Sequence, residues 1–288
     1  MSYRLVSDAT LDLPIELVEK YNIFVVPMAF TLDGEEILHY PDERNMSNEA
    51  FYEALKQGKT AVTSQINPTI YVDLFTPILE GGEDILYVAF TSGLSGTYQS
   101  AVLAKGMLEE DFPDRKLYVI DSLCASAGLG YFMKLIGEKK EAGLDIDELK
   151  DWVLAKRNRI AHWFTVDDLF HLQRGGRLSF AEAMLGSALK IKPIISVDEK
   201  GKLYVENKVR GNKKGVEYML AKIRETMDEN ECSVFIGHGD CEERALELKA
   251  KVEAETDATS VELTKIGPII GAHTGPGMLA VLFMEKEM

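Results

Sequence analysis

The sequence predicts an α/β fold in two domains, and three observations support this. Strand-like and helix-like segments alternate through the first half, which is typical of βαβ units and a parallel sheet. The second half mixes helices with a hairpin pattern, which favours an α+β domain with a mixed or antiparallel sheet. The 288 residues suffice for two ordinary domains. We therefore expect residues 1–160 to form a Rossmann-like three-layer α/β/α domain and residues 161–288 to form the α+β domain.

The elements of the first half follow from apolar runs and helix-start signals. Near-continuous apolar runs predict buried strands. Proline in a first turn, or Ser and Asn as N-cap residues, predict helix starts. The expected strands are 3–7, 23–30, 85–90 and 117–121, and the expected helices are 14–21, 47–58, 67–81, 97–110 and 125–142.

The second half follows from capping boxes and turn signals. Asp145 with Glu148, and Ser179 with Glu182, each predict the start of a helix. The stretch 198–201 is polar and contains a glycine, so it predicts the turn of a hairpin. The expected strands are 160–166, 193–197, 203–209, 234–236, 261–266 and 279–284. The expected helices are 147–159, 215–227 and 242–255, in addition to the helix after Ser179.

Composition places the chain among globular proteins. Hydrophobic residues make up 46% and charged residues 27%, which is ordinary usage. There is no run of eighteen apolar residues, so we expect no membrane span. The N-terminus lacks a basic region followed by an apolar stretch, so we expect no signal peptide. The three cysteines have no CxxC spacing, which favours a reduced, cytoplasmic chain.

The charge of the chain argues against nucleic acid as a partner and allows an acidic partner. The net charge of 32 − 47 = −15 would repel phosphate backbones, so no nucleic acid is expected. The stretch from Lys156 to Lys214 differs from the rest, because it carries 13 Lys/Arg and 6 Asp/Glu. That stretch is either a solvated face or a docking surface for an acidic partner.

The strongest local signal is the stretch 90–97, Phe-Thr-Ser-Gly-Leu-Ser-Gly-Thr. It follows a buried strand and opens a helix, which places it at the carboxyl edge of a parallel sheet, where ligands bind. Glycine lets backbone N–H groups approach a ligand, hydroxyls add donors, and the helix N-terminus adds partial positive charge. The loop therefore suits a carboxylate or a phosphate, although a helix cap in a Ser/Gly-rich turn would have the same sequence.

Two other segments could contribute to the same site. Thr63-Ser64-Gln65 precedes a helix start and could offer hydroxyls to this edge, or could serve as a capping stretch. The stretch 266–277 holds four glycines, two prolines and His273. It has little helix or strand propensity, so its surroundings must hold its shape. A histidine there can orient a hydroxyl or neutralise an anion, and the alternative is a structural turn.

The remaining polar motifs allow more than one interpretation. The pair Arg174 and Arg177 flanks two glycines and could clamp an anion or simply pair with Asp167 or Asp168. The stretch 238–241 lacks a known ligand spacing, which favours a strand-end turn over a metal site. Phosphate-binding P-loop and dinucleotide G-x-G-x-x-G motifs are absent from the sequence.

A serine hydrolase of acyl esters is an alternative function. Ser95 stands on an expected strand-to-helix turn, and Ser95, Asp240 and His273 would follow the chain order of α/β-hydrolase triads. The nucleophile elbow of those enzymes reads G-x-S-x-G, whereas Thr97 occupies the last glycine position here. A phosphate- or phospho-sugar-binding module is a third, weaker option.

Taken together and in order, these motifs resemble the DegV family, the fatty-acid-binding subunits of bacterial fatty acid kinase systems. The resemblance covers essentially the whole chain. Two departures stand out, namely Ala9 where Ser or Thr is commoner, and Ile66-Asn67-Pro68 where Pro-Ser-Pro is commoner. The motifs that carry the resemblance are residues 7–13, 63–65, 91–97, 121–122, 175–179 and 267–277.

The resemblance implies a carrier with no catalytic residues, no metal and no cofactor. A long-chain fatty acid would lie between the domains, its carboxylate held by the hydroxyls of Thr63 and Ser95, with His273 supporting them. A separate dihydroxyacetone-kinase-like subunit would phosphorylate the carboxyl group for phospholipid metabolism, with transient membrane contact among the expected interactions. The supporting ligand loops would be Ser64, Ser92, Gly93, Gly96, Thr97, Gly271 and Thr274, and the partner-facing residues would be Arg177 and Arg210.

Overall fold

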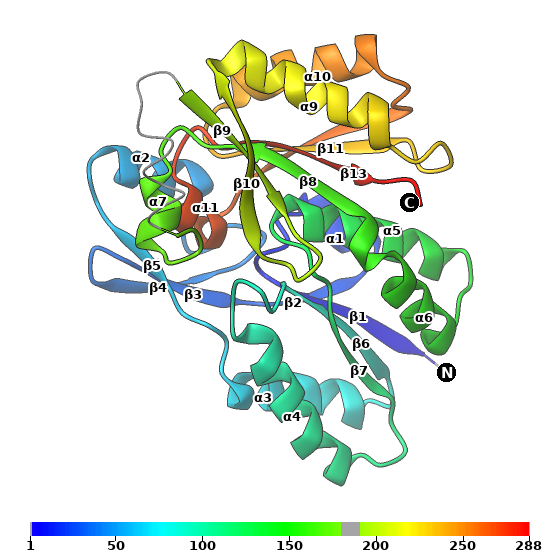
Figure 1. Cartoon of the computed structure of the whole chain (residues 1–288). Coiled ribbons are helices and arrows are strands. Elements are labelled where there is room, and N and C mark those ends of the chain that lie inside the picture. Colours follow the sequence, from blue (N-terminus) through cyan, green and yellow to red (C-terminus); the bar gives the residue numbers. More distant parts are fainter. Residues whose placement is uncertain (1, 180–190, 288) are drawn as a thin grey trace.

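Helices and sheets alternate in layers through the molecule, and a computed structural model describes residues 2–179 and 191–287 (Figure 1). From one side to the other, the layers are a helix pair, a mixed sheet, a helical layer, a parallel sheet and a second helix pair. The helix expected after Ser179 lies outside the described residues. The predicted α/β class and the predicted three-layer arrangement of the first half are confirmed.

The parallel sheet has the strand order β2-β1-β6-β7. Its strands are β1 (Tyr3–Asp8), β2 (Ile23–Val26), β6 (Asp84–Ala89) and β7 (Leu117–Asp121). One face is covered by α3 (Pro68–Glu80) and α4 (Thr97–Asp111), and the other by α1 (Ile15–Lys20), α5 (Ala127–Glu141) and α6 (Ile146–Lys156).

A small antiparallel sheet corrects one sequence prediction. The single strand expected over 23–30 is wrong, because β2 ends before Pro27 and β3 (Met28–Leu32) joins another sheet. Proline has no N–H to give to a ladder, so the chain changes sheets there. In the small sheet β3 lies between β4 (Glu35–His39) and β5 (Ala61–Thr63), and α2 (Asn48–Lys56) connects β4 to β5.

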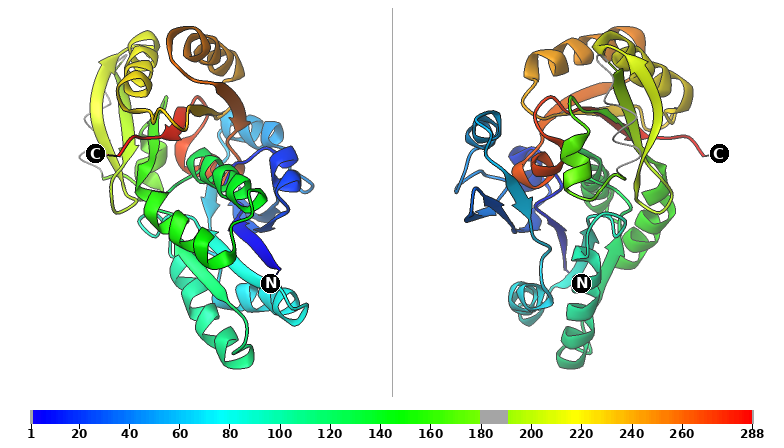
Figure 2. Two further views of the ribbon diagram at one scale, coloured as in Figure 1. Left: turned by 90° about the vertical axis from the view of Figure 1, so that its right-hand side faces the viewer. Right: turned by 60° about the vertical axis from the view of Figure 1, so that its left-hand side comes forward.

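The mixed sheet is formed by the second half of the chain, with the order β10-β9-β8-β13-β11-β12. The expected hairpin is confirmed, since β9 and β10 pair antiparallel, and the helices α9 (Asn212–Thr226) and α10 (Glu242–Glu255) cover the outer face (Figure 2). The strands are β8 (Ile160–Thr165), β9 (Ile191–Val197), β10 (Leu203–Arg210), β11 (Ser233–His238), β12 (Ser260–Lys265) and β13 (Leu279–Met284).

Short helices complete the fold, and one of them is a second correction. The glycine-rich stretch 266–277 contains a helix, α11 (Pro268–Thr274), despite its low propensity. Pro268 takes the first helical position, where its fixed φ favours the helix, and Gly275 ends it at φ +69°. The other short helices are η1 (Arg157–Arg159) and α7 (Phe170–Arg174).

The predicted helix starts are confirmed at the level of single hydrogen bonds. The Ser47 hydroxyl accepts from the N–H of Ala50 at 3.1 Å, and Asn67 Oδ1 accepts from the N–H of Ile70 at 3.1 Å. Asp145 forms the expected capping box with Glu148. Caps of this kind each stabilise a protein by about 1 kcal/mol, so local sequence fixes where these helices begin.

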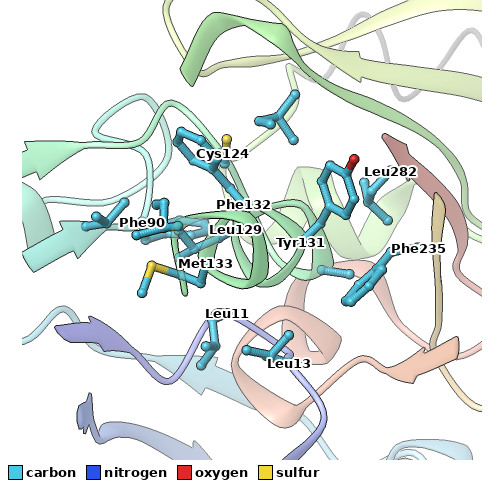
Figure 3. Close-up of a cluster of buried hydrophobic side chains, with 14 of the residues drawn as sticks. Leu11, Leu13, Phe90, Cys124, Leu129, Tyr131, Phe132, Met133, Phe235 and Leu282 are labelled. Carbon is cyan, nitrogen blue, oxygen red and sulfur yellow. The ribbon is translucent and has the colours of Figure 1, made fainter. Parts of the chain in front are cut away.

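The core is centred on α5, whose residues 127–137 are all buried. Figure 3 shows Leu129, Phe132 and Met133 among side chains from the parallel sheet and its loops, and Tyr131 beside Phe235 and Leu282 of the mixed sheet. Each sheet alternates its side chains, so the opposite faces pack on the outer helix pairs. One apolar cluster therefore joins both halves, and the domain division near residue 160 stays a prediction.

Candidate functional site

A cavity of ≈ 290 Å³ lies between the two halves of the chain. It is bounded by the loops at the carboxyl edge of the parallel sheet, by the end of β5, by α11 and by the inner face of the mixed sheet. Much of its wall is apolar, and hydroxyl, imidazole and guanidinium groups also line it. The apolar wall includes Met28, Phe90, Phe164, Leu172, Ile270 and Leu282.

Thr63 and His273 meet in the wall of this cavity, although 210 positions separate them in the sequence. Thr63 ends β5, and its Oγ1 lies 2.7 Å from Nε2 of His273 on α11. His273 Nδ1 is buried and has no hydrogen-bond partner within residues 2–179 and 191–287. Because Nδ1 has no acceptor, the imidazole proton is best placed on Nε2, from where it is donated to Thr63.

The imidazole of His273 is neutral at physiological pH. Burial, and secondarily the positive charge of Arg177, lower the pKa of His273 to about 4. Gly175 packs directly against Nδ1, where a Cβ atom would overlap the ring. The side chain is therefore a fixed hydrogen-bonding group and carries no charge of its own at pH 7.

Ser95 approaches the same cavity from the loop between β6 and α4. Its hydroxyl oxygen lies 2.9 Å from Thr97 Oγ1 and accepts from the Thr97 N–H at 3.2 Å. The fifteen-residue helix α4 follows, so the positive end of its dipole lies beside the cavity. The side-chain amide of Gln65 packs directly against Gly96. This close approach brings the segment after β5 against the start of α4.

The other predicted loop residues divide into two groups. Ser64, Gly96 and Thr274 line the cavity together with Thr63, Ser95 and His273. Ser92, Gly93, Thr97 and Gly271 are not among the lining residues. Gly93 packs against the carbonyl of Gly201 in the β9–β10 turn, and Gly271 packs against Phe51 and Tyr52.

The β9–β10 turn is fastened to the Ser95 loop. The Thr91 hydroxyl donates to the carbonyl oxygen of Gly201 at 3.0 Å. Gly201 has φ +72°, a conformation that favours glycine. The Ser92 N–H donates to Asp121 Oδ1 at 3.1 Å. These bonds hold the loop that carries Ser95 between β7 and the second half of the chain.

The two arginines predicted to face a partner occupy different environments. Arg177 is half-buried in the cavity wall, where its Nε donates to the Leu94 carbonyl at 3.0 Å. Burial lowers its pKa, but a guanidinium stays charged in proteins. Arg210 is exposed at the end of β10. Arg177 therefore contributes positive potential to the cavity, and Arg210 faces solvent.

The hydrolase alternative finds no support in this arrangement. Asp240 forms an ion pair with Lys56 at 2.5 Å, while His273 is bonded to Thr63 through Nε2. The bonds that a Ser95–His273–Asp240 triad requires are not formed among the described residues. The described part of the chain also contains no cluster of three His, Cys, Asp or Glu side chains that could hold a metal ion.

Some lining residues had no signal in the sequence. Met28 reaches the cavity only because the chain changes sheets at Pro27. His162 also lines the cavity, but both of its ring nitrogens already have hydrogen-bond partners, namely the Ile160 carbonyl and the Ala125 N–H. Burial lowers the pKa of His162 to about 4, so this imidazole is neutral too.

Comparison with known proteins gives consistent matches along the whole chain. A family model described as "Uncharacterised protein, DegV family" matches residues 2–286. A DegV domain-containing protein of Clostridium perfringens is 36% identical to this chain over 279 residues, which is 96% of each chain.

Two solved structures share the fold over their full length. A DegV lipid-binding protein from Thermotoga maritima has a TM-score of 0.85 at 28% identity, covering 100% of this chain and 99% of that one. A DegV family protein from Thermus thermophilus, described for its fatty acid binding, has a TM-score of 0.86 at 26% identity, covering 99% of this chain and 100% of that one. Among the described residues, no helix is long and apolar enough to cross a bilayer.

The lowered pKa of His273 predicts a pH dependence of stability. The unfolded chain binds a proton on this side chain below pH about 6.5, whereas the folded protein resists protonation down to about 4. The stabilising contribution is therefore complete above pH 6.5 and is lost as the pH falls toward 4. Urea unfolding between pH 7 and 4.5 should show a shallower loss in His273→Gln than in the wild type. Parallel slopes, or an NMR titration midpoint of His273 near 6.5, would contradict the assignment.

Proposed function

This chain belongs to the DegV family, and from that premise and the cavity geometry we propose that it binds a long-chain fatty acid and presents the carboxyl group to a separate kinase. The observation that carries the proposal is the Thr63–His273 hydrogen bond in the wall that also holds Ser95. Polar donors and apolar side chains line the same cavity, and an amphipathic ligand requires both.

The carboxylate would be held by neutral donors. With the imidazole proton on Nε2 of His273, Thr63 accepts that bond and its own hydroxyl proton is free for the ligand. Ser95 supplies a second hydroxyl, and Arg177 with the N-terminus of α4 supplies positive potential. A buried carboxylate needs several donors, because its desolvation would otherwise prohibit binding.

The apolar wall would take the acyl chain. Burying a methylene group gains about 0.8 kcal/mol. A chain of about sixteen carbons would then gain on the order of 10 kcal/mol, before the cost of ordering the ligand. The hydrophobic gain supplies affinity, and the hydroxyl cluster sets which end of the molecule lies beside Thr63 and Ser95.

In this proposal the chain binds the fatty acid, and a separate kinase subunit phosphorylates it. In this phosphorylation an oxygen of the carboxylate bonds to the γ-phosphorus of a nucleoside triphosphate, and the bond to the leaving nucleoside diphosphate breaks. Such a transfer needs a nucleotide site and metal ions, which the kinase subunit would supply. A dihydroxyacetone-kinase-like subunit fits that requirement. The exposed Arg210 lies in the stretch from Lys156 to Lys214, which is basic in an acidic chain, and the surface around Arg210 is our candidate for the surface that faces the kinase.

Removing either hydroxyl should weaken fatty acid binding without abolishing the fold. Hydrogen bonds to charged groups contribute about 1.5–3 kcal/mol, so Ser95→Ala and Thr63→Val should each raise the Kd for oleate by about tenfold or more. The matched control is Ser92→Ala, which removes a hydroxyl from the same loop but outside the cavity lining. Equal affinities for Ser95→Ala and wild type, or ester hydrolysis that disappears in Ser95→Ala, would refute the carrier proposal.

Charge reversal at Arg210 should separate lipid binding from phosphorylation. Arg210→Glu should keep the affinity for fatty acid and lower the rate at which a purified kinase subunit phosphorylates the bound lipid. Arg224→Glu is the control, because Arg224 is also exposed but lies in the last turn of α9. An unchanged phosphorylation rate in Arg210→Glu would exclude this surface from the kinase interface.

A further inference from the structure

A second hollow lies on the far side of the mixed sheet from the fatty acid cavity. Its volume is ≈ 170 Å³, and it is bounded by the start of α9, by α10 and by the ends of β8 and β13. Along β8, Phe164 faces the first cavity whereas Thr165 faces the hollow. Figure 1 shows α9 and α10 side by side over the outer face of the sheet.

Thr165 provides the first sign of a ligand. The side chain is only 3% exposed, and its hydroxyl oxygen is buried with no hydrogen-bond partner in the described part of the chain. An unpaired buried hydroxyl destabilises the folded protein, because it loses its hydrogen bonds to water. A bound group that pairs with this hydroxyl would remove that cost.

The N-terminus of α9 provides the second sign. The helix has fifteen residues, and no side chain caps its first turn, because the N-cap residue is Gly211 at φ +82°. The first N–H groups of an α-helix have no partner within the helix, and together with the dipole they favour an anion. Asn212 and Lys213, which begin this helix, line the hollow.

The charges around the hollow point to the same kind of ligand. Lys213, Arg244 and Lys251 line it, against the single carboxylate of Glu247 among the described lining residues. Arg244 also contacts Asp167 at 3.2 Å, but a guanidinium has five N–H donors and keeps others for a ligand. This concentration of positive charge contrasts with the net charge of −15 of the whole chain.

We propose that this hollow binds a phosphate dianion, either free phosphate or the phosphate group of a small phosphorylated metabolite. A tetrahedral anion uses hydroxyl, amide and ammonium donors that converge from several directions, which is the set present here. Sites for drug-sized ligands have volumes of about 300–1,000 Å³, so the hollow is too small for a nucleotide. The proposal is independent of fatty acid binding.

Amide NMR of the full chain tests the proposal directly. Inorganic phosphate and glycerol 3-phosphate should be titrated separately at constant ionic strength. Saturable shifts at Asn212, Lys213 and Lys214 support the site, and the tighter binder of the two identifies the source of the phosphate. The absence of saturable shifts at these amides with both ligands up to 20 mM (an order of magnitude above a Kd of about 1 mM) would overturn it.

Three variants separate a built site from general charge attraction. Thr165→Val should weaken phosphate binding by about tenfold, because the hydroxyl bonds a charged group, while the unfolding midpoint stays equal or rises. Lys251→Gln should weaken binding several-fold. Lys249→Gln makes the same charge change on α10 outside the hollow and should leave the Kd unchanged. Equal weakening by both lysine variants, or no effect of Thr165→Val, would refute the site.

Discussion

The burial of α5 between two sheets is the contact on which the rest of this structure depends. Residues 127–137 of that helix are buried all round, and the apolar cluster around them takes side chains from both halves of the chain. Tyr131 shows how the helix also satisfies polar groups, because its hydroxyl accepts from the N–H of Met284 at 3.2 Å. The cavity between the two halves lies at the N-terminal end of this helix, where Ala125, Ser126 and Ala127 form part of its wall.

Buried polar contacts then set the position of His273. Asp12 accepts from the Ser126 hydroxyl at 2.6 Å and from the Gly267 N–H at 2.8 Å. Burial raises the pKa of Asp12 to about 7, whereas these two hydrogen bonds lower it by favouring the ionised carboxylate. Tyr52 donates to the Ile266 carbonyl at 3.0 Å. Since Gly267 is the N-cap of α11, contacts from the first half of the chain fix the helix that carries His273.

Sequence reasoning predicted the features of this fold that are local. Caps at Ser47, Asn67 and Asp145 were visible as motifs, and the alternation of strands and helices identified the parallel sheet. Two expectations were wrong for different reasons. Pro27 divides one apolar run between two sheets, and this break could have been inferred from the proline itself. The glycine-rich stretch after Gly267 contains a helix whose N-terminal end is held by a buried contact with Asp12, which sequence patterns do not indicate.

The candidate site could be predicted only in part for the same reason. Ser95 could be placed at a sheet edge from its own loop, whereas its position in the same cavity wall as the Thr63–His273 pair depends on packing between distant segments. The periodicity of apolar residues gives no information on such contacts. Only the resemblance to a family assigned Thr63, Ser95 and His273 to one site. The roles of these residues toward a ligand stay predictions.

The most direct test of fatty acid binding is native mass spectrometry of freshly purified protein, followed by solvent extraction and lipid identification. We expect one fatty acid per chain, released as an intact free acid. A protein that is purified without lipid and that also fails to take up added fatty acids would contradict it.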